Sequence, residues 1–310
     1  MAFETQLITL RNEGMQLCVK SQSIPLRDLF RTFAVRGKRN VFVVLTGYFD
    51  ESYDKDVFTL CCSISNFTGW SEISRSWMKC VDAKNKSLRA EGRPEISRYH
   101  SSHANARDHD FKGWAREERD QLAISLMSAL HRGRAWVTTI SYSLPLRDFV
   151  KEFNIEGNPL PFCYKELIKF IMLEINNQVE TARKVLRQIK PIKYTLFHER
   201  CDYDAAYLEG FNVMMNDPTF RGKGLFSTIA PIGWEDCVPL QPADMLAYEA
   251  FKDALRQFNR KDRRASLNYL LQSDKFGGRA KQMSANNIKE WRGIVDKAVE
   301  KKRSERQSPL

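Results

Sequence analysis

The chain has 310 residues, of which 43% are hydrophobic and 28% are charged, and it carries a formal net charge of +11. These fractions are typical of a soluble globular protein, and the length suits one large domain or two ordinary ones. The sequence contains no uninterrupted apolar run long enough to form a helix that spans a bilayer.

The N-terminal sequence and the cysteines indicate where the protein works. The opening stretch MAFETQLITLRNEG has neither the basic region nor the apolar region of a secretory signal. The seven cysteines form no CxxC pair, which favours reduced thiols over a disulfide framework. We therefore expect a cytoplasmic protein.

The basic residues are concentrated at the two ends of the chain. Residues 1–49 carry seven Lys and Arg against three Asp and Glu, and residues 260–310 carry fourteen against six. The intervening residues 50–259 carry 28 against 29 and are nearly neutral. Basic ends suit a nucleic-acid partner, whose phosphates they neutralise, but they are equally typical of solvated tails.

The elements begin after an N-terminal extension at residues 1–38. An apolar, β-branched run predicts a strand at Val41–Asp50, and a second strand at Asp56–Ser65 follows closely enough to form a hairpin. A helix is expected at Ser71–Val81, and a polar, basic loop is expected from there to His109.

The rest of the chain alternates strands and helices. Strands are predicted at Ala135–Tyr142, Lys193–Glu199 and Leu225–Ile232, and helices at Trp114–His131, Phe162–Val179, Asp204–Met215, Pro242–Phe258 and, with a basic outer side, 284–303. This order predicts an α/β fold with a mixed β-sheet flanked by helices. The main domain is expected at 39–260, followed by a basic C-terminal helical segment at 261–310.

Two adjacent acids, Asp50 and Glu51, stand where the first strand ends, in the stretch TGYFDESYD. A solvated turn is one explanation, because acids are favoured in turns. A metal or acid–base site at the edge of the sheet is the other. In a regular strand the two side chains point to opposite faces, so only one of them would be central to such a site.

Two later segments add acids to the same edge of the predicted sheet. One strand ends in Glu199, and the helix beginning near Pro242 carries Asp244, with Gln241 on the same face. Ligands of open α/β sheets collect outside strand ends, so Asp50, Glu199 and Asp244 converge if their strands are neighbours. Three close carboxylates repel one another, and their oxygens suit Mg²⁺ or Mn²⁺ better than zinc. Simpler explanations remain, such as the helix dipole for Asp244 and a strand-end position for Glu199.

Three short motifs carry a family resemblance. YFDES near a strand end, FHE closing a later strand and PLQPADMLAYE opening a late helix together resemble the domain of unknown function 3800 family, which contains bacterial and phage-associated proteins. The resemblance covers roughly residues 41–257 and leaves both basic ends unexplained. It implies a ribonuclease-H-like fold in which a strand Asp, a second strand acid and a late-helix Asp bind metal.

By position, the resemblance assigns Asp50, Glu199 and Asp244 to the metal, with Glu51 and Gln241 at accompanying motif positions. His100 or His103, in the stretch RYHSSH, matches a histidine that members carry before the first long helix. The chain departs from the pattern at Tyr53, where members more often have Gly.

These observations favour a metal-dependent, nuclease-like phosphodiester hydrolase that acts on nucleic acid in phage defence or in a mobile element. In this hypothesis Asp50, Glu199 and Asp244 hold Mg²⁺ or Mn²⁺. Glu51 is a further ligand or the general base, and Gln241 orients a ligand or a phosphate.

Two alternatives remain open: a non-catalytic module that binds nucleic acid or protein and retains the fold, and a purely structural acidic cluster. Carboxyl oxygens within reach of one ion favour the enzyme, whereas acids paired with arginine favour the alternatives. Zinc at His100, His103 and His109 is disfavoured because no cysteine accompanies them, although these histidines could assist at a phosphate.

Overall fold

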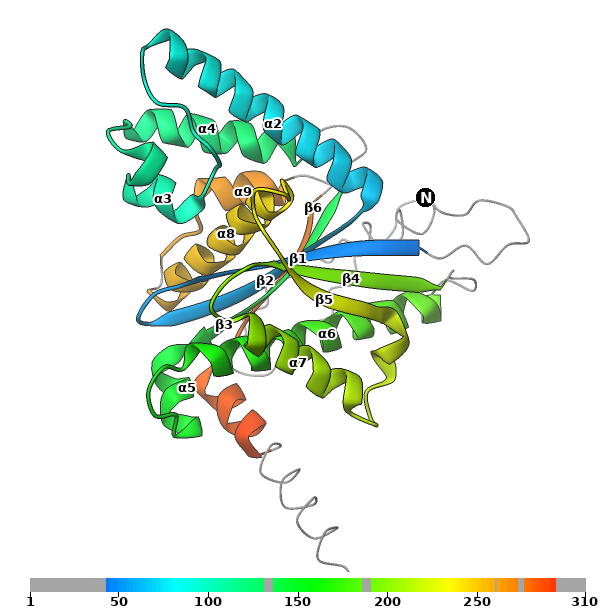
Figure 1. Ribbon diagram of the computed structural model, residues 1–310. Helices are drawn as coiled ribbons and strands as arrows, with labels where there is room; N and C mark the ends of the chain where they lie inside the picture. The colour runs from blue at the N-terminus through cyan, green and yellow to red at the C-terminus, as the bar shows by residue number, and fades with distance from the viewer. Residues whose placement is uncertain (1–42, 131–135, 186–190, 260, 273–275, 294–310) are drawn as a thin grey trace, which may run out of the picture.

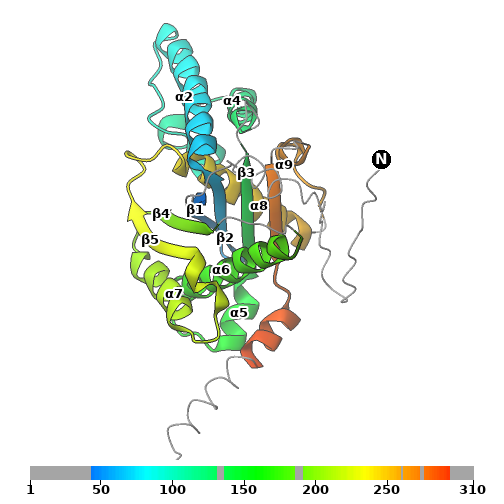
Figure 2. The same ribbon diagram turned by 90° about the vertical axis from the view of Figure 1, so that its right-hand side faces the viewer.

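The computed structural model describes residues 43–130, 136–185, 191–259, 261–272 and 276–293. The N-terminal extension and the last part of the expected C-terminal helix lie outside these ranges. At the centre is a six-stranded mixed sheet in the order β5-β4-β1-β2-β3-β6, with helices on both faces (Figure 1 and Figure 2). The expected α/β class with a mixed sheet flanked by helices is therefore confirmed.

The elements have the following bounds. The strands are β1 (Val43–Tyr53), β2 (Val57–Asn66), β3 (Val137–Pro145), β4 (Ile192–Glu199), β5 (Phe226–Ile232) and β6 (Phe276–Gln282). The helices are α2 (Phe67–Ala90), α3 (Ser101–Ala106), α4 (Arg116–Ala129), α5 (Leu146–Phe153), α6 (Leu160–Val185), α7 (Asp204–Asn216), α8 (Leu240–Phe258) and α9 (Ala265–Leu271), with 3₁₀ turns η1 (His109–Phe111) and η2 (Arg221–Leu225).

Strand β1 lies inside the sheet, parallel to β4 and antiparallel to β2. The expected hairpin and the expected neighbourhood of the first strand and the strand ending at Glu199 are both observed. At Gly47, the neighbouring strands β2 and β4 bring their side chains close to the backbone of β1. A Cβ atom there would lie 2.9 Å from both Cys62 Sγ and Leu196 Cδ2, so a larger residue would displace neighbours on two strands.

Each face of the sheet is covered by its own helical layer. Helices α5, α6 and α7 pack on one face, where Leu45 and Phe49 of β1 join their core. Helices α2, α4 and α8 lie on the other side, where Tyr48 of β1 joins Trp77 and Leu240. Adjacent residues of β1 therefore serve different layers, as the two-residue period of a strand requires.

A helical arm made of α2, α3 and α4 is inserted between β2 and β3 and projects away from the sheet (Figure 1). The expectation of a helix ending at Val81 and a loop to His109 was wrong, because α2 continues to Ala90. Asn66 caps its start by accepting a hydrogen bond from Gly69 N at 2.6 Å. The second half of α2 is mostly solvated, so it lacks the apolar stripe that identifies a helix in a sequence.

The chain returns to the sheet after α9, in strand β6, which pairs in parallel with β3. This strand is glycine-rich and basic, so its sequence carries no strand pattern. Arg279 and Lys281 of β6 bind the buried Glu174 at 2.7 and 2.8 Å. These two cations, expected in a basic C-terminal helical segment outside the main domain, are instead part of a strand of the central sheet.

The described part of the C-terminal helix covers residues 285–293 and docks through Ile288 and Trp291. Trp291 packs against Phe149, Phe153 and Phe170, with ring centroids 5.5, 4.7 and 5.0 Å away. The docking surface is thus built by α5 and α6, on the face of the sheet opposite α8. Among the described helices, none combines the length and apolar character that crossing a bilayer requires.

We predict that Trp291→Ala lowers the free energy of unfolding by about 3–5 kcal/mol, because it leaves a cavity between three aromatic rings. Urea unfolding followed by fluorescence and circular dichroism measures this loss. Leu208→Ala is the control, since that side chain is 50% exposed. A similar loss in both variants would show that the docking of Trp291 contributes nothing specific.

Candidate functional site

The pairing of β1 with β4 brings two of the expected acids together. The register aligns Phe49 with His198, so Asp50 and Glu199, one residue further along each parallel strand, lie level at the same edge of the sheet. Tyr48 and Phe197 both pack in the layer of α8, and side chains two residues apart share a face. Asp50 and Glu199 therefore face α8, which carries Asp244.

Asp50 is the most constrained acid of the site, with only 8% of its surface exposed. Its Oδ1 accepts a hydrogen bond from Glu51 N at 2.7 Å, whereas its Oδ2 is buried and has no hydrogen-bond partner. Burial raises the pKa of Asp50 well above its usual range, and the charges of Asp244, Glu51 and Glu199 raise it further. An unsatisfied carboxylate oxygen among other acids is a destabilising arrangement that a bound cation would relieve.

Asp244 stands in the first turns of α8 and is held by the segment that precedes α3. Ser101 N donates a hydrogen bond to its Oδ2 at 2.7 Å, and His100 Nδ1 lies 3.8 Å from its Oδ1. Burial raises the pKa of Asp244 to about 6, although the hydrogen bond from Ser101 N and the charge of Arg98 act in the opposite direction. Asp244 thus titrates close to neutral pH.

Glu199 has an arginine partner that the sequence analysis did not identify. Arg98 Nη1 donates to Glu199 Oε1 at 2.8 Å, and its guanidinium lies 4.6 Å from the centroid of the Trp234 ring. A single arginine in a basic loop carries no sequence signal that could have singled it out. Pairing with arginine is the geometry that favours the non-catalytic alternatives.

The three expected ligands are neighbours but do not surround a single point. Among the described residues, two groups of three or more His, Cys, Asp or Glu have ligand atoms within 4.8 Å of one another, and Asp50, Glu199 and Asp244 are not one of them. They are close enough for Asp244 and Glu199 each to raise the pKa of Asp50. Holding one ion between all three therefore requires their side chains, and Arg98, to move.

Glu51 lies on the other face of the sheet, as the alternation of a regular strand predicts. Tyr207 of α7 donates a hydrogen bond to its Oε2 at 3.2 Å. Burial raises the pKa of Glu51, while the hydroxyls of Tyr164 and Tyr207 act to lower it. Glu51 influences the site through its charge and its backbone N–H, rather than by pointing toward Asp244.

Gln241 joins α8 to the helical arm. Its Oε1 accepts hydrogen bonds from Trp77 Nε1 and from Tyr99 N, both at 3.1 Å. We expected Gln241 to orient a ligand or a phosphate, but its side-chain oxygen is occupied by contacts within the protein. Gln241 instead fixes the backbone of the segment that presents Arg98 and His100 to the acids.

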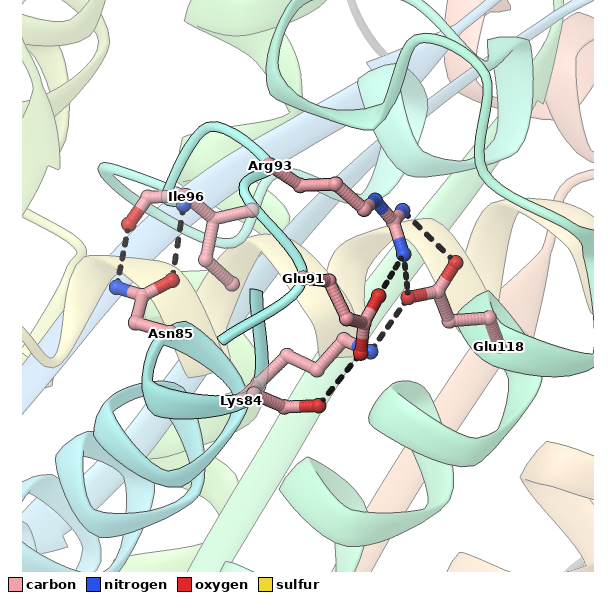
Figure 3. Close-up of polar contacts among 7 residues, drawn as sticks. Lys84, Asn85, Glu91, Arg93, Ile96 and Glu118 are labelled. Carbon is pink, nitrogen blue, oxygen red and sulfur yellow. Dashed lines mark hydrogen bonds and ion pairs between the residues drawn. The ribbon is translucent and has the colours of Figure 1, made fainter. Parts of the chain in front are cut away.

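The segment from Glu91 to His100 is anchored at its start by the polar contacts of Figure 3. The Asn85 side chain brackets the backbone of buried Ile96, donating to its O at 3.0 Å and accepting from its N at 2.9 Å. Arg93 binds both carboxylate oxygens of Glu118 at 2.7 and 3.0 Å. These contacts connect α2, the segment and α4, and so hold the arm in position above the site.

His100 is the histidine best placed to act at the acids. Burial lowers its pKa to about 4, and the charge of Arg98 contributes to the lowering. The ring is therefore neutral at pH 7 and has a nitrogen able to accept a proton. Its Nδ1 lies 3.0 Å from Ser102 Oγ, in a pair where either atom can be the donor.

Comparison with known proteins adds no assignment to this geometry. No family model matches the chain, and no curated protein matches it. The resemblance to the domain of unknown function 3800 family therefore stays a proposal that rests on the three motifs.

We predict that Asn85→Ala destabilises the protein by about 3 kcal/mol, because the N–H and C=O of Ile96 lose their buried partners. Urea unfolding measures the loss, and hydrogen exchange should show faster opening of residues 91–100. Ser87→Ala, which removes only an exposed hydrogen bond to Glu91, is expected to change stability by less than about 0.5 kcal/mol. Equal effects in the two variants would contradict the bracketing role.

Asp244 also predicts a pH dependence of stability. The pKa of Asp244 is about 6 in the folded protein, which is above its value in the unfolded chain. The stability that the protonated carboxyl contributes is therefore fully present below about pH 4 and is lost as pH rises through 6. With EDTA present, the free energy of unfolding of Asp244→Asn, relative to that of the wild type, should therefore rise by about 2 kcal/mol between pH 4 and pH 8. Leu208→Ala, which removes no titratable group, should show a constant difference, and a constant difference for Asp244→Asn would contradict the raised pKa.

Proposed function

We propose that the protein is a metal-dependent, nuclease-like phosphodiester hydrolase with a ribonuclease-H-like fold. The observation that carries the proposal is the buried Oδ2 of Asp50, which has no partner and lies among other acids. Other buried polar atoms of the described residues also have no partner, but only this one is a carboxylate oxygen whose pKa three neighbouring acids raise, and a hard cation is the species that suits such oxygens.

The placement of the acids supports the fold part of the proposal. The first acid is on a strand inside the mixed sheet, the second is on the adjacent parallel strand and the third is on a late helix. This is the arrangement that the resemblance implies. The motifs YFDES, FHE and LQPAD would then describe one site, although about 190 residues separate the first from the last.

Asp50, Glu199 and Asp244 fit Mg²⁺ or Mn²⁺ by donor type, since all three offer carboxylate oxygens. A bound ion would polarise a phosphoryl oxygen and lower the pKa of an attacking water. Two side chains of the protein, His100 and Arg98, would act beside the bound ion. Neutral His100 can accept a hydrogen bond from a water beside Asp244, and Arg98, once it releases Glu199, can bind a phosphate oxygen beside Trp234.

Nucleic acid is the proposed substrate because of the net charge of +11. Many of the cations at the two ends lie outside the described residues, and Arg279 and Lys281 are paired with Glu174. The resemblance adds the proposed setting, which is phage defence or a mobile element in the cytoplasm.

One observation favours a second function, a binding module that keeps the fold without catalysis. The ion pair between Arg98 and Glu199 already neutralises one of the acids. If this pair is permanent, the arginine occupies the place of a cation, and the surface acts only by binding. Hydrolysis measured with defined metals separates the two functions.

We predict that the wild type cleaves at least one member of a panel of single- and double-stranded DNA and RNA when Mg²⁺ or Mn²⁺ is added. Asp50→Asn and Asp244→Asn should each lower the rate by about 100-fold or more, the scale of losing one preorganised electrostatic contact. Both variants should keep their circular dichroism spectrum, and in EDTA their melting temperature should rise because repulsion is relieved.

Asp120→Asn is the matched control, because this carboxylate is on the outer surface of α4 with 61% of its side chain exposed. It should leave the rate unchanged. Binding of nucleic acid without metal-dependent cleavage would favour the binding module. Activity retained in both site variants, together with a loss of several degrees in melting temperature, would support a structural acidic cluster.

A further inference from the structure

A second group of metal-ligating side chains lies beside the carboxylates. His103 comes from α3, Asp108 from the turn that follows and His109 from the start of η1. One ligand atom of each residue lies within 4.8 Å of those of the other two. His103 is half-buried, while Asp108 and His109 are exposed, so an ion can reach the group from solvent.

The backbone of the turn forces the two imidazoles together. Asp108 N donates to His103 O at 3.2 Å, which closes the turn after α3. Arg107 and His109 have left-handed φ angles of 60° and 48°, which residues other than glycine adopt rarely. The ring centroids of His103 and His109 are only 4.0 Å apart. Strained backbone of this kind persists where the surrounding structure holds it, and it is frequent at ligand sites.

The base of the turn is firmly anchored. Phe111, at the end of η1, is buried in the core of the arm. The backbone N and the Oγ of Ser97 both donate to Asp110 Oδ2, at 2.8 and 2.7 Å. The ligand group therefore sits on a fixed platform, and its members need only side-chain rotation to adjust.

The donor types select the ion. Two imidazole nitrogens and one carboxylate oxygen suit borderline transition metals such as Zn²⁺, whereas Mg²⁺ prefers oxygen ligands alone. Ligand atoms of a tetrahedral zinc site are about 3.3 Å apart, given metal–ligand distances of about 2.0–2.1 Å, so a small closure of the group suffices. We propose that His103, Asp108 and His109 bind a borderline transition-metal ion such as Zn²⁺, with solvent completing the coordination.

This site is separate from the carboxylate centre but adjoins it. His103 stacks on His100 at 4.1 Å between ring centroids, and His100 faces Asp244. An ion held by the group ties the end of α3 to η1. It thereby fixes the helix whose first residue, Ser101, donates its N–H to Asp244.

The test is a titration of the full-length, metal-free protein with ZnCl₂ by calorimetry, and with CoCl₂ followed by visible absorption. The double variant His103→Asn/His109→Asn should bind one equivalent of Zn²⁺ fewer than the wild type and lose the corresponding Co²⁺ bands. The difference is the readout, because His198, Cys201 and Asp204 form another group of possible ligands. Asp108→Asn should weaken binding by at least about tenfold, the least that disturbing a ligand shell costs.

Two controls give the result its meaning. Asp120→Asn removes one surface carboxylate of the arm and should bind Zn²⁺ as the wild type does. The double variant Asp50→Asn/Asp244→Asn removes the carboxylate centre, which can bind Zn²⁺ itself, and adding His103→Asn/His109→Asn to this variant should still remove one further Zn²⁺ equivalent, which makes the result independent of the proposed hydrolase function. The circular dichroism spectrum in EDTA establishes that each variant is folded. If the double histidine variant does not fold, the Zn²⁺ affinity of Asp108→Asn tests the proposal instead.

The proposal is overturned if the wild type binds no Zn²⁺, or if neither the double histidine variant nor Asp108→Asn changes stoichiometry or affinity. If the two histidine substitutions remove no further Zn²⁺ equivalent from Asp50→Asn/Asp244→Asn, the separation of the two sites is overturned.

Discussion

The parallel pairing of β1 with β4 is the constraint on which the site depends. Backbone hydrogen bonds between these strands set a register in which Phe49 meets His198, and the next residue of each strand is an acid. The pairing also sets which face each side chain occupies, because the alternation of a strand leaves no freedom once the register is given. Asp50 and Glu199 share a face for this reason, while Glu51 turns to the tyrosines of α6 and α7.

Electrostatic repulsion is the consequence of that geometry. Burial and neighbouring acids raise the pKa of Asp50, and burial raises the pKa of Asp244 to about 6. The free protein reduces the repulsion in two ways, by favouring protonation of the buried acids and by pairing Glu199 with Arg98. A cation would compete with both, so metal binding at this site should be coupled to proton release and to the position of Arg98.

The helical arm brings the remaining polar groups to the edge of the sheet. Its insertion between β2 and β3 places the segment from Glu91 to Ser101 over α8, where Gln241 and Asp244 bind its backbone. The same segment carries Arg98 and His100, and its continuation holds the histidines of the second group. A change in the arm, whether by a ligand or by a metal ion, therefore reaches the acids through direct contacts.

Local patterns in the sequence were sufficient for the α/β class and for the strands that build the centre of the sheet, whereas the proximity of the three acids was expected only on the condition that their strands are neighbours. Buried strands and amphipathic helices carry periodic apolar residues, and strand ends in an α/β sheet have predictable neighbours. Apolar periodicity did not predict the elements whose buried residues do not recur at a regular spacing, namely the solvated half of α2 and the glycine-rich strand β6. It also could not reveal Arg98 as the partner of Glu199, the occupied oxygen of Gln241, or Asp108 as a companion of two histidines. The contacts of Arg98 with Glu199 and of Gln241 with the helical arm were decided by the tertiary structure alone, because they join residues more than 100 positions apart in the chain. Asp108 is close to both histidines in the sequence, but only the turn after α3 brings the three side chains together.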